Sequence, residues 1–133
     1  FVIGTKFILN VYKLIYPYGV SAETAQSAMA PVLLIGRHSV PPELEPQFNH
    51  TYDAERLPAA YAVPGYIRGR RFEGVVGEPK YTTVHELESL QVSDSLEWKT
   101  WSTGGSPLWA DTMRPNMANT DGSPGLYTRI FPK

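Results

Sequence analysis

The sequence predicts an α+β fold in which strand, helix, strand, strand, helix and strand follow one another from residue 31 onward. Clusters of proline and glycine separate these segments, and each has the hydrophobic pattern of its type. A right-handed crossover at each helix gives a four-stranded antiparallel sheet with both helices on one face. The chain has 133 residues, the length of a single domain with an ordinary hydrophobic core.

Residues 32–38 predict the first strand, because they form a continuous apolar run that ends in polar residues. Two prolines and a glutamate at 41–43 suit the start of a helix, which we expect to be regular from about 45 to 56. Pro58 would cost a helix interior one hydrogen bond and a steric clash. The main helix is therefore expected to end or kink just before this proline.

The second half of the chain predicts a hairpin, a helix and a last strand. Strands are expected at 66–76 and 81–88, where β-branched and aromatic residues flank a Gly-Glu-Pro-Lys connection. A Ser-Asp-Ser sequence offers an N-cap for a helix at 96–102. Residues 114–125 form a polar loop without an apolar run, so we expect the final strand at 126–131.

Residues 1–28 are expected to be an extension added to a domain of residues 29–133. Their first part is apolar and β-branched, but polar residues interrupt it and make it too short and too polar for a transmembrane span. No basic residue precedes the apolar run, as a signal peptide would require. Met29 followed by a strand is typical of a translation start. The alternative is an extra strand and linker native to the protein.

Composition excludes several classes of function. The formal net charge of −1 provides no overall attraction for nucleic acid or for an anionic membrane, so neither partner is expected. Cysteine is absent, which removes thiolate nucleophiles and Cys-based metal sites and fits a cytoplasmic location. Nucleotide-binding and acyl-enzyme motifs are missing, and the three histidines lack metal-binding spacing, so no cofactor and no metal are expected.

The predicted sheet has helices on one face only, and strands this apolar would leave the other face as a large exposed patch. A second copy of the chain is the simplest cover. We therefore expect a homodimer in which two sheets stack face to face.

Five motifs recur in order along the chain: Pro31-Val32-Leu33-Leu34-Ile35, Phe48-Asn49-x-x-Tyr52-Asp53-x-Glu55-x-Leu57-Pro58, Val63-Pro64-Gly65-Tyr66, Gly77-Glu78-Pro79-Lys80-Tyr81 and His85-Glu86-Leu87-Glu88-Ser89. Their order and spacing resemble the EthD-like group of the dimeric α+β barrel superfamily. The resemblance implies ferredoxin-like subunits that dimerise through their sheets, each with a pocket between helices and sheet. Relatives include cofactor-free isomerases, decarboxylases, cyclases and monooxygenases of aromatic or polyketide-like compounds, and haem-dependent enzymes.

The chain departs from this family pattern at three positions. Similar sequences usually carry Trp where this chain has Thr51, and His where it has Arg56. The second change exchanges a group that titrates near neutrality for a permanent cation. His85 stands where relatives often carry Tyr, which offers another acid-base group.

Candidate catalytic residues are His85, His50, Asp53 and His38. Candidate substrate-binding residues are Asn49, Thr51, Tyr52, Arg56, Tyr81, Trp98 and Trp101. Helical spacing places Asn49, Asp53 and Arg56 on one stripe. Either Asp53 or Glu55 orients a substrate or acts as a base while Arg56 binds an anionic group, or Asp53 and Arg56 simply pair with each other. The histidines act in proton transfer or are structural, and strand alternation places His38 on the face shared with Leu34 and Gly36. The tryptophans form a pocket floor or core.

Three arginines form the only basic cluster of the sequence. Strand geometry places Arg68 and Arg70 on one face and Arg71 on the other. Anion binding is one reading of this cluster, and a solvated edge or an interfacial ion pair is the other.

The favoured hypothesis is a small cofactor-independent enzyme, a lyase or isomerase, that acts on an aromatic or polyketide-type molecule by proton transfer. In this hypothesis a histidine is the acid-base group, and Arg56 or Asn49 holds a developing oxyanion. The alternatives are a noncatalytic dimeric protein that binds a small hydrophobic or aromatic ligand, and a haem-binding or monooxygenase-type member of the superfamily.

Overall fold

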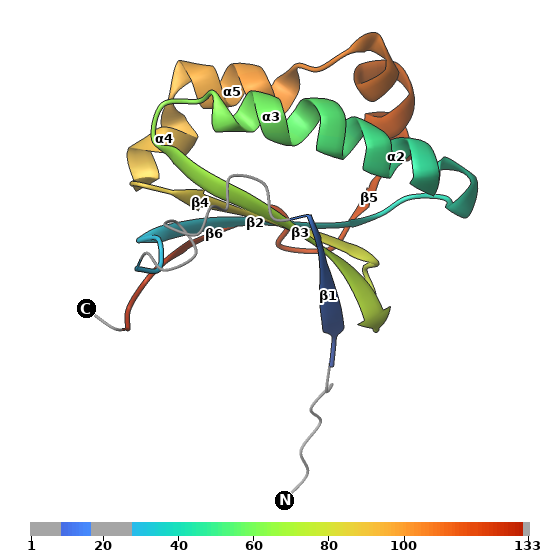
Figure 1. Ribbon diagram of the computed structural model, residues 1–133, viewed down its shortest axis with the longest axis horizontal. Coiled ribbons are helices and arrows are strands. Elements are labelled where there is room, and N and C mark those ends of the chain that lie inside the picture. Colours follow the sequence, from blue (N-terminus) through green and yellow to red (C-terminus); the bar gives the residue numbers. More distant parts are fainter. Residues whose placement is uncertain (1–8, 17–27, 132–133) are drawn as a thin grey trace, which may run out of the picture.

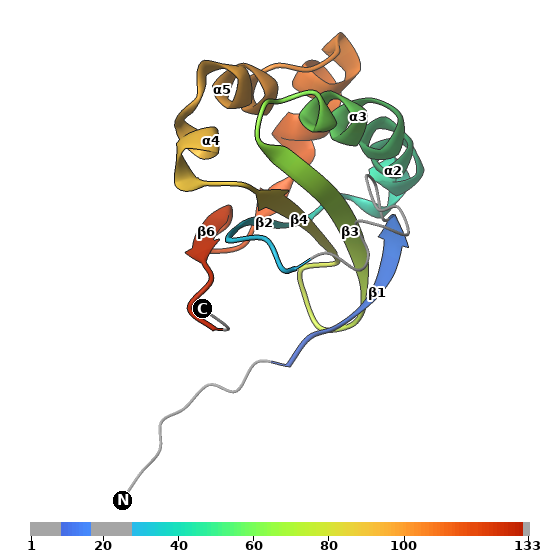
Figure 2. The same cartoon turned by 60° about the vertical axis from the view of Figure 1, so that its left-hand side comes forward.

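The computed structural model describes residues 9–16 and 28–131, and in this part of the chain six strands form one antiparallel sheet. The helices gather over one face of the sheet, as both Figure 1 and Figure 2 show. The α+β class is correct. The predicted four-stranded ferredoxin-like fold is wrong, because two further strands belong to the sheet.

The strands run in the order β1-β3-β4-β2-β5, and β6 also pairs with β2. Their bounds are β1 (Val11–Tyr16), β2 (Val32–Ser39), β3 (Tyr66–Val76), β4 (Tyr81–Leu87), β5 (Ala118–Asn119) and β6 (Gly125–Thr128). The strands expected from the sequence are thus present, and β4 lies between β2 and β3 at the centre of the sheet.

The first additional strand, β1, matches the alternative of an extra strand in residues 1–28; it pairs antiparallel with β3 and covers what would otherwise be an open sheet edge. Lys13 Nζ lies 3.2 Å from Glu73 Oε2 across this pairing. The β-branched and aromatic residues of β1 suit a strand, but they lie in the segment expected to be an extension. Residues 1–8 and 17–27 of that segment lie outside the described residues, and the domain boundary near Met29 stays a prediction.

The second additional strand, β5, lies within the segment predicted to be a polar loop. It consists of two residues, which pair with His38 and Ser39 at the end of β2. A two-residue strand needs only backbone hydrogen bonds to its neighbour and no apolar run. The hydrophobic pattern of the sequence therefore does not predict it. Strand β6 pairs with the first half of β2, so β5 and β6 share one edge of that strand.

The first helical segment runs from Pro42 to Tyr61 without a break. It begins as the 3₁₀ turn η1 (Pro42–Leu44), continues as α2 (Glu45–Thr51), widens into the π turn η2 (Tyr52–Arg56) and ends as α3 (Leu57–Tyr61). Figure 1 shows α2 and α3 as one continuous helix above the sheet.

The π turn explains how this helix passes Pro58, where we expected an end or a kink. Leu57 N–H donates to the carbonyl of Tyr52, five residues back, as in a π turn. Pro58 then occupies the first turn of α3, where its missing N–H costs little. Residue-level spacing rules for an α-helix therefore do not hold across 52–56.

The remaining helical segments cover the other half of the same sheet face. They are α4 (Leu90–Asp94), α5 (Leu96–Thr103), the π turn η3 (Trp109–Met113) and the 3₁₀ turn η4 (Arg114–Asn116). The Ser95 hydroxyl accepts a hydrogen bond from Trp98 N–H at 3.1 Å, which confirms the predicted N-cap of the second main helix.

Two hydrophobic clusters fill the space between the helices and the sheet. One lies under α3, α4 and α5 and includes Val32, Ala60, Val63, Tyr66, Leu87, Val92 and Trp98. The other lies under α2 and η3 and includes Val40, Phe48, Tyr52, Leu57, Tyr81, Trp109 and Met113. The clusters leave room between them, and that room is the candidate site.

The sheet face away from the helices carries an ion cluster. Both nitrogens of the Arg68 fork bond the carboxylate of Glu86, and Arg70 Nη2 lies 3.3 Å from it. The predicted orientation, with Arg68 and Arg70 on one face and Arg71 on the other, is confirmed. The reading as a solvated edge is wrong, since Arg68 and Glu86 are buried.

No helix in the described part of the chain is both long and apolar enough to cross a membrane. The homodimer through the sheet stays a prediction.

Candidate functional site

A cavity of about 350 Å³ lies between the two hydrophobic clusters, with the sheet as its floor and helical segments as its walls. It is lined by Leu34, Gly36, His38, Tyr52, Arg56, His85, Trp98, Trp101, Ser102, Trp109, Arg114, Met117, Asn119, Ser123 and Pro124. We call this space the inner cavity. Six of the predicted site residues, His38, His85, Tyr52, Arg56, Trp98 and Trp101, meet there.

The floor of the inner cavity is open because β2 carries glycine at its centre. A Cβ atom on Gly36 would meet only the ring of His38, at 3.9 Å, and no backbone atom within 4 Å. A larger side chain at this position would extend into the cavity, while its backbone conformation would remain acceptable for any residue. Gly36 is therefore a position at which the cavity can be filled without disturbing the sheet.

All three tryptophans of the chain line the inner cavity. The rings of Trp98 and Trp101, from α5, have centroids 4.7 Å apart, and both meet His85 edge-on at 5.4 and 5.2 Å. Trp109, from the π turn η3, meets Tyr52 edge-on at 5.3 Å. Aromatic faces and edges in these arrangements suit a planar ligand.

His38 and His85 reach the cavity from neighbouring strands, β2 and β4. Strand alternation predicted that His38 shares a face with Leu34 and Gly36, and all three line the cavity. Burial, and then the nearby Arg71 charge, lower the pKa of His38 to about 4. Burial, with smaller effects of Arg56 and His38, lowers the pKa of His85 to about 3. Both imidazoles are therefore neutral at pH 7.

The two imidazoles differ in their hydrogen bonds. His85 Nδ1 lies 2.9 Å from the hydroxyl of Tyr66, which holds the ring in place. When Tyr66 donates, the single N–H of the neutral ring is at Nε2 and is available to a ligand. His38 Nε2 is buried and has no hydrogen-bond partner, although its ring stacks on Tyr52 at 5.9 Å.

Arg56 lies between two indoles, with its guanidinium carbon 4.3 Å from the ring centre of Trp101 and 4.7 Å from that of Trp109. Its Nη1 donates to the carbonyls of Trp101 and Gly104 at 2.9 and 3.2 Å. These carbonyls end α5, so Arg56 also caps that helix. Trp101 Nε1 donates back to the Arg56 carbonyl at 2.8 Å.

Arg114, which the sequence did not single out, caps the same helix end. It donates to the carbonyls of Ser102, Thr103 and Gly104 at 3.0, 2.5 and 2.7 Å. Two guanidinium groups thus converge on Gly104 and on the wall of the cavity. No local pattern around residue 114 predicts this contact, because its partners are backbone carbonyls ten to twelve residues earlier.

Three predicted site residues form a separate network outside the inner cavity. Arg71 donates to Asp53 Oδ1 and to Asn49 Oδ1, each at 2.6 Å. Asn49 donates to the hydroxyl of Tyr81, which donates in turn to Glu45. The expected pair between Asp53 and Arg56 is wrong, because Asp53 pairs with Arg71 and Arg56 turns to α5.

The last two predicted site residues do not reach the cavity either. Thr51 is fully buried, and its hydroxyl has no hydrogen-bond partner. His50 is exposed on the outer side of the helix. Because Thr51 and His50 are not among the cavity residues, neither has a place in chemistry there.

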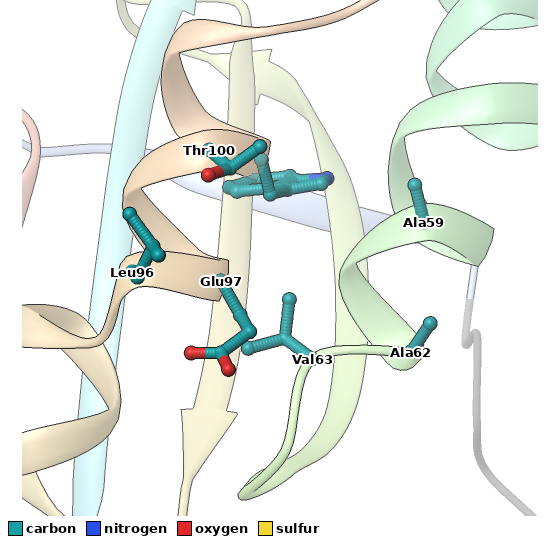
Figure 3. Close-up of a pocket in the computed structure, with 7 residues that line it drawn as sticks. Ala59, Ala62, Val63, Leu96, Glu97 and Thr100 are labelled. Atoms are coloured by element: carbon teal, nitrogen blue, oxygen red, sulfur yellow. The ribbon is translucent and has the colours of Figure 1, made fainter.

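A second hollow, shown in Figure 3, lies on the outside between α3 and α5. It measures about 430 Å³ and is lined by Ala59, Ala62, Val63, Leu96, Glu97, Thr100 and Trp101. We call it the outer groove. Trp101 lines both the outer groove and the inner cavity. The groove has one ionisable residue and no polar cluster, so the inner cavity is the better candidate site.

Among the described residues, no group of three or more histidine, aspartate or glutamate side chains is placed to hold a metal ion. Comparisons with protein-family models, with curated proteins and with solved structures find no match for this chain.

Proposed function

We propose that this protein binds a small aromatic molecule in the inner cavity and promotes a proton transfer on it without a cofactor. The observation that carries the proposal is one cavity that brings together every tryptophan of the chain and two neutral imidazoles. An engineered cavity of roughly 150 Å³ holds a benzene ring, so 350 Å³ suits a bicyclic compound or a substituted single ring.

Because both imidazoles are neutral, His85 and His38 can act as a hydrogen-bond donor or as a weak base. With a pKa of about 3, His85 is a weak base at pH 7, but its N–H can polarise a carbonyl oxygen of the ligand. His38 has the higher pKa of the two, about 4, and an unpartnered Nε2. It is therefore the better proton acceptor once negative charge develops on the substrate.

Two π turns support this location for the site. Tyr52 and Arg56 lie at the two ends of η2, and Trp109 begins η3, and all three side chains line the cavity. Such widened turns inside helices are frequent at functional sites. The family resemblance, the homodimer and a polyketide-type substrate are part of the same proposal and stay predictions.

Replacing Gly36 with leucine is expected to abolish ligand binding, because the new side chain fills the cavity floor. Binding is measured with neutral and charged naphthalene derivatives, through the shifts of the three indole N–H signals in a ¹H–¹⁵N spectrum. The matched control is Ala59→Leu, which fills the outer groove instead. Ligands that still bind to Gly36→Leu but not to Ala59→Leu would place the site in the groove and overturn the proposal.

Proton transfer is tested with 2-tetralone, a bicyclic ketone with acidic protons next to its carbonyl. The wild type is expected to accelerate exchange of these protons with D₂O by about a hundredfold, near the lower end for general acid-base catalysis because both histidines are weak bases. His38→Gln and His85→Gln should each lose at least about tenfold of that acceleration, whereas His50→Gln on the exposed helix face should retain it.

The second candidate function is noncatalytic binding of the same ligand. The low pKa of both imidazoles favours it, since a weak base contributes little to proton abstraction at pH 7. 2-Tetralone that binds to the wild type and exchanges no faster than in buffer would select this candidate over the enzyme.

A further inference from the structure

The walls of the inner cavity carry an unbalanced positive charge. Arg56 and Arg114 are among the fifteen residues that line it, and none of the fifteen is an aspartate or a glutamate. Burial is the main reason that both imidazoles are neutral, and the charge of Arg56, on the cavity wall, lowers the pKa of His85 further. A cavity lined in this way has a positive potential that no side chain in its lining neutralises.

Arg56 differs in this respect from the other two buried arginines of the described chain. Arg71, which is 1% exposed, pairs with Asp53, and Arg68, which is 7% exposed, pairs with Glu86. Arg56 is 5% exposed and makes no ion pair within 4 Å among the described residues. Glu55, next to it in the chain, is exposed. Buried charges in proteins are normally paired, and Arg56 lacks the anionic partner that such a charge normally has.

The hydrogen bonds of Arg56 leave part of its guanidinium unused. Nη1 donates to two carbonyls, whereas Nε is buried and has no partner. A carbonyl is a dipole and does not supply a full counter-charge. Burial lowers the pKa of Arg56 and the repulsion of Arg114 adds to this, while Tyr52 and the exposed Glu55 oppose it without reversing the direction.

His38 supplies a second unpartnered polar atom on the same cavity. The residue is 3% exposed, and its Nε2 makes no hydrogen bond. Trp109 Nε1 is a third, so three buried nitrogens without a partner belong to residues that line this cavity, each more than nine-tenths buried, and they indicate a ligand with polar atoms of its own. A purely apolar ligand offers no polar atom, so these nitrogens would stay unsatisfied.

We propose that the natural ligand of the inner cavity is an aromatic anion, a carboxylate or phenolate on one or two rings, whose charged oxygen pairs with Arg56 and whose ring lies against the indoles. The inference rests on the proposed function and adds the charge of the ligand to it. A charge-assisted bond to a delocalised oxygen anion uses the planar donor geometry of a guanidinium, and the tryptophans bury the ring.

The test compares three ligands of nearly equal shape on the wild type: 2-naphthoate, its neutral amide and 2-naphthylmethylammonium. Calorimetry at pH 7 and low salt is expected to show 2-naphthoate binding about ten- to hundredfold more tightly than the amide, as for a hydrogen bond to a charged group. The cation is expected not to bind. Equal affinity for the amide and the carboxylate would overturn the inference and leave the proposed function intact.

Variants test whether Arg56 causes the preference for the carboxylate over the amide. Arg56→Gln should reduce the ratio of carboxylate to amide affinity to near unity, whereas Lys99→Gln removes an exposed charge from the middle of α5 and should leave the ratio unchanged. Because Arg56 also caps α5, Arg56→Lys provides a charge-retaining companion that should keep most of the preference. If Arg56→Gln does not fold, the three-ligand comparison on the wild type decides alone. If none of the ligands binds, both the inference and the proposed function fail.

Discussion

Lowering the pH from 7 to 4 is expected to remove on the order of 5 kcal/mol from the free energy of unfolding, through His38 and His85. Both side chains are 3% exposed and neutral in the folded protein, with pKa values lowered from 6.5 to about 4 and about 3. A loss of this size is comparable with the whole stability of a small domain, so the protein should unfold near pH 4.

The free energy of unfolding falls with pH because the unfolded state binds more protons than the folded state. Above pH 6.5 neither state protonates these histidines, and stability is at its full value. As the pH falls below 6.5, the unfolded chain takes up two protons that the folded chain refuses, and the unfolding free energy falls by up to about 2.7 kcal/mol per pH unit. The loss levels off only below about pH 4 for His38 and about pH 3 for His85.

Urea unfolding at several pH values measures this slope. His38→Gln and His85→Gln should each reduce the slope between pH 6 and pH 4.5 by about 1.4 kcal/mol per pH unit, the value for one proton. His50→Gln is the matched control, because His50 is exposed and the slope should not change. Equal slopes in the wild type and both buried-histidine variants would contradict the neutral imidazoles on which the proposed chemistry depends.

Strand periodicity predicted part of the candidate site correctly. Alternation along a strand has a period of two that packing does not alter, so it placed His38 beside Leu34 and Gly36 and separated Arg71 from Arg68. It could not tell which of these residues would face a cavity. That depends on glycine at the floor and on the distance between two helices, which are properties of the tertiary structure.

Helical periodicity was less reliable, and the reason is a single π turn. The α-helical spacing of Asn49, Asp53 and Arg56 predicts one stripe, but the wider turn at 52–56 separates Arg56 from the other two. Pro58 was the available signal, since a proline cannot donate the hydrogen bond that an uninterrupted helix requires there. An expected kink proved to be a change in helix type.

Other contacts had no signal in the sequence. The caps that Arg56 and Arg114 place on α5 join residues to backbone carbonyls, and carbonyls are the same at every position of a chain. The pairing of β1 with β3 likewise depends on an available sheet edge rather than on a motif. Of the three positions at which the sequence departs from the pattern it resembles, Thr51 is buried outside the cavity, whereas Arg56 and His85 line it.

Replacing Asp53 with alanine is expected to cost about 3 kcal/mol of unfolding free energy, because it leaves Arg71 as a buried cation without a carboxylate. Arg71 is 1% exposed, whereas the side chain of Asp53 is 34% exposed, which puts the cost near the lower end for a broken buried pair. The guanidinium keeps its bond to Asn49 and its position near the rings of Phe48 and Tyr52, so the loss is electrostatic.

A double-mutant cycle separates this loss from simple loss of contacts. Arg71→Met removes the cation together with its need for a partner, so the Asp53→Ala, Arg71→Met double variant should be more stable than Asp53→Ala alone. Glu73→Ala is the matched control, since it breaks only solvent-accessible pairs, with Lys13 and Lys80, and should cost less than about 1 kcal/mol. Equal costs for Asp53→Ala and Glu73→Ala would show that Arg71 does not depend on its carboxylate.

Equal costs would also weaken the inference at Arg56, because both predictions rest on the same premise that a buried guanidinium in this fold requires an anion. In Asp53→Ala, Arg71 becomes a buried arginine without a carboxylate partner, as Arg56 is, but Arg71 does not line the cavity. We therefore expect 2-naphthoate to stabilise the wild type by binding at Arg56. It should not restore the stability that Asp53→Ala loses, because it does not reach Arg71.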